Sequence, residues 1–346
     1  MSRDLARSGC CFAVLIALAA TVPASAAAAT APTSAPRAPA APTATTAPTA
    51  PAPPVKASLT LYLPDAFFVH HQALMVAGRT LHVGGVVRPY VPGQWVTVRA
   101  AIGRHVIKTD RLRVEPASSG RYGRFTESLT SNSTGTVAVS VKHDATPQVA
   151  RFAARRRYTL LATTAGFGST GRLVQLVQQK LAELHFYIPQ TGVYDAGTGW
   201  ALDAYHRLLG WGTSQSLDHK TLIWLLNGWG QFKVRYPKQG KHAEGNLSRQ
   251  VLALVDGARV YRIYPISSGK PSTPTILGNF HVYAKVPGYL PDGMYYSNFF
   301  YGGYAVHGYD PAPDYPASHG CMRLPIADAI GVYNWLDIGD GVDTYY

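Results

Sequence analysis

Two runs near the C-terminus decide the fold, YAVHG at residues 304–308 and SHGCMRL at residues 318–324. The first run is a short apolar strand that ends in His307 and Gly308, and the second is the densest polar cluster of its region. Around them, residues 240–346 alternate β-type runs such as 251–255 and 260–264, with one helix expected late. The pattern predicts a mainly β domain over residues 240–346, with a cysteine and a histidine on neighbouring segments.

Cys321 and His307 are a candidate nucleophile and base. A thiol with a pKa of about 8.5 is mostly protonated at neutral pH, so a nucleophilic cysteine needs a nearby imidazole or cation that favours the thiolate. His307 and Arg323 can supply these groups. Gly320 permits a tight turn that presents backbone N–H groups to a developing oxyanion. This layout favours acyl transfer.

Two other interpretations of the cluster stay open. His307, His319 and Cys321 form a possible zinc site, although His-x-Cys is not a standard ligand pair and no fourth ligand is adjacent. Alternatively, Cys321 is a structural residue in a packed turn, and both histidines are irrelevant to it. We expect no metal and no cofactor, because thiolate, imidazole and backbone amides supply every role that acyl transfer needs.

These residues carry a family resemblance. His307-Gly308 followed by Ser318-His319-Gly320-Cys321-x-Arg323-Leu324 resembles the signature of the L,D-transpeptidase catalytic domain, also called the YkuD domain. The likeness continues through short motifs in the family's order, which are SSG (267–269), TPT (273–275), GNF (278–280), MYY (294–296) and FFYGG (299–303). The resemblance implies a β-sandwich with a late helix.

The resemblance also implies a two-step acyl transfer on peptidoglycan stem peptides. Cys321 would attack the carbonyl that precedes terminal D-alanine, and His307 would deprotonate the thiol and then the incoming amine. The residues expected to support the oxyanion and the loop are His319, Gly320, Ser318 and Arg323. Those expected to line the substrate groove are Tyr296, Tyr304 and Gly308. Ordinary strand packing is the alternative for both tyrosines.

Two rival functions use the same domain. An L,D-carboxypeptidase would pass the acyl group to water, and a wall-binding scaffold would carry an inactive domain. The presence of both Cys321 and His307 argues against the scaffold. The resemblance further implies that carbapenem β-lactams inhibit the protein by acylating it.

Length and composition indicate several folded modules. The chain has 346 residues, 47% hydrophobic and 15% charged, and after the N-terminus it contains no further apolar run long enough to cross a membrane. Residues 1–26 are typical of an export signal, with two arginines, an apolar run at 12–22 and ASA at 24–26. An uncleaved anchor is the alternative. Cleavage would leave Cys321 as the single cysteine of a secreted, extracytoplasmic and wall-associated protein.

Residues 27–55 are almost entirely Ala, Pro, Thr and Ser and are predicted to form an extended linker. Residues 56–157 follow with short β-type runs separated by turn residues, a pattern that resembles an antiparallel immunoglobulin-like sandwich. They hold 15 basic and 5 acidic residues, and therefore +10 of the net charge of +13. This field suits an anionic wall polymer, whereas export disfavours nucleic acid. A solvated basic face is the alternative.

Residues 168–229 are predicted to form three short helices. Apolar residues at helical spacing mark the first over 173–184, Thr198 is expected to cap the second, and Asp218 to cap the third over 221–226. The order QQKL (178–181), GVYD (192–195), Thr198 and AL (201–202) resembles a peptidoglycan-binding domain. A plain helical spacer is the alternative.

Overall fold

The computed structural model describes residues 52–346 of the chain. The predicted export signal and linker residues 27–51 lie outside the described residues. The described part is mainly β, with four helices. None of the helices within residues 52–346 is long and apolar enough to cross a membrane.

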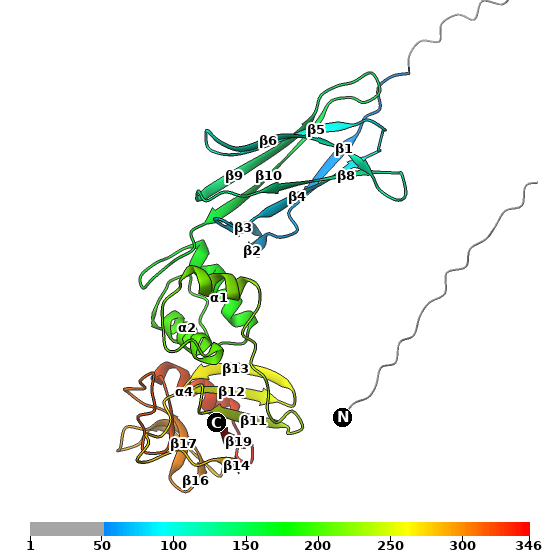
Figure 1. The fold of residues 1–346 in the computed structure, drawn as a ribbon. Helices are drawn as coiled ribbons and strands as arrows, with labels where there is room; N and C mark the ends of the chain where they lie inside the picture. The colour runs from blue at the N-terminus through cyan, green and yellow to red at the C-terminus, as the bar shows by residue number, and fades with distance from the viewer. Residues whose placement is uncertain (1–51) are drawn as a thin grey trace, which may run out of the picture. The chain divides into compact units, whose positions relative to one another are not determined.

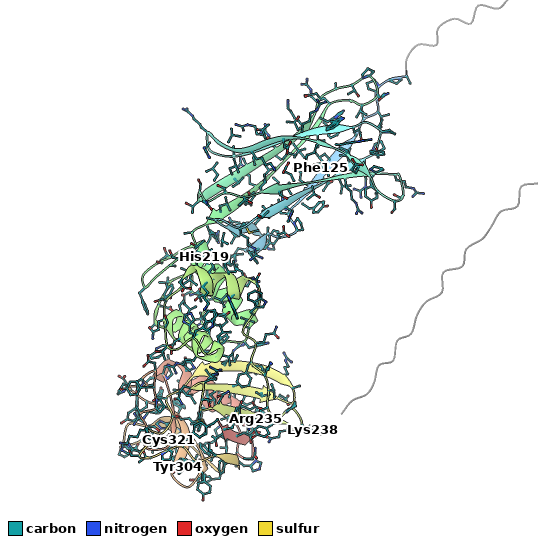
Figure 2. The ribbon with its side chains drawn as sticks, in the orientation of Figure 1. Phe125, His219, Arg235, Lys238, Tyr304 and Cys321 are labelled. Atoms are coloured by element: carbon teal, nitrogen blue, oxygen red, sulfur yellow. The ribbon has the colours of Figure 1, made fainter. Side chains whose placement is uncertain are left out.

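Residues 58–161 form two sheets around one apolar core, here called the N-terminal sandwich (Figure 1). One sheet has the order β1-β4-β8-β7 and the other β2-β3-β10-β9-β5-β6. The strands are β1 (Ser58–Tyr62), β2 (Phe67–Val69), β3 (Gln72–Val76), β4 (Leu81–Arg88), β5 (Trp95–Ile102), β6 (His105–Arg113), β7 (Glu115–Pro116), β8 (Gly123–Leu129), β9 (Gly135–His143) and β10 (Phe152–Leu161). Phe125, which Figure 2 labels, is part of the shared core.

The sandwich departs from the predicted pattern in two places. Strand β10 pairs with β3 in parallel, so the sandwich is not antiparallel throughout. The predicted linker also ends too late. The Val55 amide donates to Gln148 O at 2.8 Å, so this residue already pairs with the sandwich.

Three helices follow, and we call residues 172–226 the helical segment. They are α1 (Arg172–Glu183), α2 (Ala196–Leu209) and α3 (His219–Leu226). Asp218 caps α3 as predicted, since its side chain accepts from the Thr221 amide. The predicted cap of α2 is wrong. Asp195 caps that helix by accepting the Thr198 amide, so Thr198 lies inside the first turn.

Two further sheets and one helix make up residues 241–345. The first sheet has the order β13-β12-β11-β19-β14 and the second β15-β16-β17-β18. Their strands are β11 (Lys241–Asn246), β12 (Val251–Asp256), β13 (Arg259–Pro265), β14 (Gly278–His281), β15 (Ala284–Tyr289), β16 (Tyr295–Tyr301), β17 (Tyr304–Gly308), β18 (Met322–Leu324) and β19 (Gly341–Tyr345). Helix α4 (Ile326–Trp335) is the predicted late helix and packs on β16 and β17.

Strand β12 is buried on both faces. Leu252 and Leu254 point into the core between the two sheets. Val251, Ala253 and Val255 instead join a cluster that contains the apolar residues of α1, α2 and α3. The helical segment therefore shares a core with the first sheet, which explains why β12 reads as an unbroken apolar run.

Candidate active site

The register of β17 and β18 brings the candidate nucleophile and base to one face. The two strands are parallel, with His307 opposite Arg323 and Val306 opposite Met322. Val306 and Met322 lie in the core. Because side chains alternate along a strand, His307, Arg323 and the preceding Cys321 face the other way. His307 and Cys321 are thus diagonal neighbours on the face that points away from the core.

Backbone groups surround the Cys321 thiol. The Ala305 amide donates to Cys321 Sγ at 3.4 Å, and the thiol donates to Gly303 O at 3.5 Å. Within residues 52–346, His307 is not among the hydrogen-bond partners of this sulfur. Burial raises the pKa of the Cys321 thiol, although the Ala305 amide and the positive charge of Arg323 lower it. The thiol is therefore protonated at neutral pH.

His307 is 2% exposed and held in a defined orientation. Its Nδ1 lies 2.8 Å from Gly308 O, and this carbonyl can only accept, so we assign the proton to Nδ1. Burial, together with the positive charge of Arg323, lowers the pKa of His307 to about 4, although the hydrogen bond to Gly308 O raises it. At neutral pH the imidazole is therefore uncharged, with Nε2 free to accept a proton.

This charge state differs from the expectation that His307 and Arg323 favour a thiolate. Burial disfavours the charged form of both groups, because it raises the pKa of Cys321 and lowers that of His307. The resting pair is therefore a neutral thiol and a neutral imidazole. If Cys321 acts as a nucleophile, its proton has to leave as the sulfur attacks, and His307 Nε2 is an acceptor on the same face.

Ser318 fixes the loop that carries Cys321. This serine is 1% exposed, and its Oγ donates to Cys321 O at 2.6 Å and accepts the Gly320 amide at 3.0 Å. Gly320 has a φ of +124°, and a β-carbon there would collide with the Tyr304 ring. The Gly320 amide serves the loop itself and is not free for an oxyanion, contrary to the sequence expectation.

A second segment, Ser267–Ser268, clamps both ends of this loop. Ser267 and Arg323 exchange two backbone hydrogen bonds of 2.9 Å, and the Ser318 amide donates to Ser268 O at 3.0 Å. The Ser267 hydroxyl donates to Tyr315 O at 2.6 Å. The sequence analysis named these serines only within the SSG motif at residues 267–269. The feature that could have identified them is a pair of small polar residues shortly after an apolar strand.

The remaining charged candidates lie around the loop. His319 is exposed, and its Nε2 accepts from Lys270 Nζ at 3.2 Å. The Arg323 guanidinium lies 3.9 Å from the centre of the Tyr309 ring. Within residues 52–346, no group of three or more His, Cys, Asp or Glu side chains is placed to hold a metal ion.

The three residues predicted to line the groove lie in two different parts of the domain. Tyr304 lies against Gly320, close to Cys321 (Figure 2). Tyr296 packs on Tyr333 of α4, with ring centres 5.0 Å apart. A β-carbon on Gly308 would lie 2.7 Å from Ala329 Cβ, so this glycine admits α4 to the strand. The structure brings only Tyr304 to the loop.

Comparisons with known proteins identify the family of the domain that carries these residues. Residues 240–343 match the family model of the L,D-transpeptidase catalytic domain. No protein of curated function matches the chain. A solved L,D-transpeptidase from Xylanimonas cellulosilytica is 32% identical over 53% of this chain and 98% of its own, with a TM-score of 0.48.

Two further solved structures are similar at lower identity. An L,D-transpeptidase from Stackebrandtia nassauensis is 22% identical over 53% of this chain and 96% of its own, with a TM-score of 0.34. The catalytic domain of the E. faecium L,D-transpeptidase, solved acylated by ertapenem, is 24% identical over 31% of this chain and 98% of its own, with a TM-score of 0.27. Through the domain at residues 240–343, the chain belongs to the L,D-transpeptidase (YkuD) family.

Proposed function

We propose that the protein is a peptidoglycan L,D-transpeptidase that works through a thioester on Cys321. The observation that carries the proposal is the pairing of β17 with β18. It sets a neutral thiol and a neutral imidazole on one face, with the Nδ1 of His307 tied to Gly308 O. Neither group is charged in the resting enzyme, and His307 can accept the thiol proton when the sulfur attacks.

The first half-reaction forms the thioester. His307 Nε2 accepts the thiol proton while Cys321 Sγ bonds to the carbonyl that precedes terminal D-alanine. The imidazolium then gives this proton to the leaving amine, and D-alanine departs. Because Ser318 Oγ occupies the Gly320 amide, we assign the oxyanion contact to the Cys321 amide.

The second half-reaction consumes the thioester. His307 takes a proton from the amine of a second stem peptide, that nitrogen bonds to the acyl carbon, and the sulfur leaves and recovers the proton. A water molecule in place of the amine would give a carboxypeptidase. The same chemistry predicts that carbapenems inhibit the protein, since a β-lactam carbonyl would acylate the same sulfur.

The other modules fit a wall-associated enzyme. Within the proposal, residues 1–26 export the protein, and the helical segment binds peptidoglycan as a peptidoglycan-binding domain. The N-terminal sandwich binds anionic wall polymers through its excess of basic residues. Tethering to the wall would raise the local concentration of stem peptides.

Mass spectrometry of a disaccharide tetrapeptide incubated with the full chain tests the proposal. We expect loss of D-alanine together with a cross-linked dimer, and neither product with Cys321→Ala. Tripeptide without dimer would replace transpeptidation by carboxypeptidation. No turnover by the unmodified protein would refute the enzyme and favour the scaffold.

A further inference from the structure

Helix α2 carries a buried ion pair that the proposed reaction does not use. Asp203 and Arg207 are one turn apart, and their side chains are 2% and 3% exposed. The carboxylate contacts Arg207 Nη2 and accepts the Ser214 amide at 3.1 Å. Two charges have therefore been removed from water inside the helical segment.

The guanidinium of Arg207 reaches out of its own helix to the catalytic domain. Its Nη1 donates to Ile266 O at 2.9 Å and to Gln250 O at 3.2 Å. Gln250 directly precedes strand β12, and Ile266 directly follows β13. One nitrogen thus joins the adjacent ends of two neighbouring strands.

These strand ends hold the segment that clamps the catalytic loop. Gln250 accepts the Ser268 amide through Oε1 at 2.9 Å and donates through Nε2 to Ser268 Oγ at 2.7 Å. Ser268 O in turn accepts the Ser318 amide. A continuous set of hydrogen bonds therefore runs from Arg207 through Gln250 and Ser268 to Ser318, whose hydroxyl holds Cys321.

The energetic cost of the pair argues for a geometric role. A buried ion pair stabilises a protein no better, and often worse, than apolar residues of similar size. The neighbouring contacts between α2 and strands β12 and β13 are apolar, which is sufficient for joining the two parts. What apolar residues cannot supply is a planar guanidinium that contacts the Asp203 carboxylate through Nη2 and two backbone carbonyls through Nη1.

We propose that Asp203 and Arg207 are positioning residues for the Cys321 loop. Asp203 orients the guanidinium, Arg207 fixes the carbonyls of Gln250 and Ile266, and the Ser267–Ser268 clamp is thereby held in the geometry that acylation requires. The inference rests on the proposed function only for the identity of the reaction that this geometry favours. The helical segment is then part of the catalytic apparatus as well as a tether.

The double variant Asp203→Asn/Arg207→Met removes both charges together, so neither charge is left buried without its partner. We expect the rate of Cys321 acylation by ertapenem, and kcat for D-alanine release, to fall by about tenfold or more while KM changes little. Hydrogen exchange at the Ser268 and Ser318 amides should become faster. Arg207→Lys keeps the positive charge but lacks the guanidinium, so it should lower the acylation rate and kcat by an intermediate amount. This variant provides the test if the double variant does not fold.

His206→Gln is the matched control. His206 is buried on the same helix and contacts Ser214 O at 2.7 Å and Thr221 Oγ1 at 2.8 Å, both inside the helical segment. We expect this variant to lose stability yet keep the acylation rate and the exchange pattern of the unmodified protein. Equal losses in His206→Gln and Arg207→Lys would overturn the proposal, because any damage to the helices would then suffice.

Alkylation by iodoacetamide separates this proposal from the proposed function, since it needs only the thiol. Slower alkylation and faster exchange in the charge variants would support positioning even if the unmodified protein released no D-alanine, an outcome that refutes only the transpeptidase. Unchanged alkylation, ertapenem acylation and exchange in both charge variants would refute positioning, whatever the peptide substrate shows.

Discussion

The N-terminal sandwich and the catalytic domain are both pairs of β-sheets, but they place their polar residues differently. In the sandwich, strand β8 alternates strictly between buried and exposed residues, and Arg124, Thr126 and Ser128 meet water. Its one buried charge, Glu127, is paired with Lys108. In the catalytic domain, β12 and β19 are buried along almost their whole length. The buried polar side chains there include His242, Glu244, Ser267, Ser268, His307, Ser318 and Asp343.

This difference fits the separate roles that we propose for the two regions. Buried polar groups are costly unless each is hydrogen-bonded, so a region that gathers them has fixed geometry, as chemistry requires. The sandwich instead carries exposed charge. A cavity of about 710 Å³ on its surface is lined by Arg155, Arg156 and Arg157. Charge on an exposed face acts through its field and tolerates movement.

The largest effect should come from the reacting pair. Cys321→Ala should abolish D-alanine release, and His307→Gln should lower its rate by about 10²–10⁴-fold, because no other group accepts the thiol proton. Steady-state release of D-alanine measures both. A matched substitution in the sandwich, Arg156→Ser, should leave the rate unchanged, and a comparable loss there would contradict the assignment of roles.

The second prediction concerns pH. Because burial raises the pKa of Cys321 above its ordinary value, the thiolate fraction is small at neutral pH and grows with alkalinity. Iodoacetamide alkylation should therefore accelerate by about tenfold per pH unit from pH 6 to beyond pH 8. His307, whose pKa is lowered to about 4, should add no inflection in this range. A plateau between pH 5 and 8 would instead reveal a preformed thiolate and imidazolium.

A pair of serine substitutions compares the two regions directly. Ser318→Ala should lower the free energy of unfolding by about 1–3 kcal/mol, since Cys321 O and the Gly320 amide lose a buried partner. Ser140→Ala in the sandwich removes only an exposed hydrogen bond of 3.4 Å to Arg99 O and should cost less than about 0.5 kcal/mol. Urea unfolding of both variants provides the measurement. Equal costs would remove the distinction between the regions.

The smallest effect should be on polymer binding. Arg156→Ser should weaken binding of the full chain to polyphosphate by a few-fold at low salt, with the difference fading as salt screens the charge. Arg259→Ser, an exposed arginine of the catalytic domain, is the control and should change binding less. Titration at several salt concentrations measures both. Equal losses would show that binding follows net charge alone.

The sequence predicted that Cys321 and His307 lie on neighbouring segments, and the pairing of β17 with β18 bears out this placement. The protonation states escaped prediction, since they depend on how deeply packing buries Cys321 and His307. The capping error at α2 arose because Asp195 and Thr198 are both good caps, and only backbone geometry decides between them.

Long-range contacts escaped prediction for a different reason. Asp203 and Arg207 have the spacing of an ordinary helical ion pair, which is usually a surface feature. The carbonyls that Arg207 binds lie 43 and 59 residues further along the chain. The apolar run of β12 indicates that both of its faces are covered, but no local pattern indicates that the helical segment covers one of them.

Intact-mass analysis with ertapenem tests the central claim most directly. The account predicts a single covalent adduct on the full chain, mapped by peptide analysis to Cys321, absent from Cys321→Ala and formed much more slowly by His307→Gln. An adduct on any other residue, or formation at an unchanged rate in His307→Gln, would contradict it.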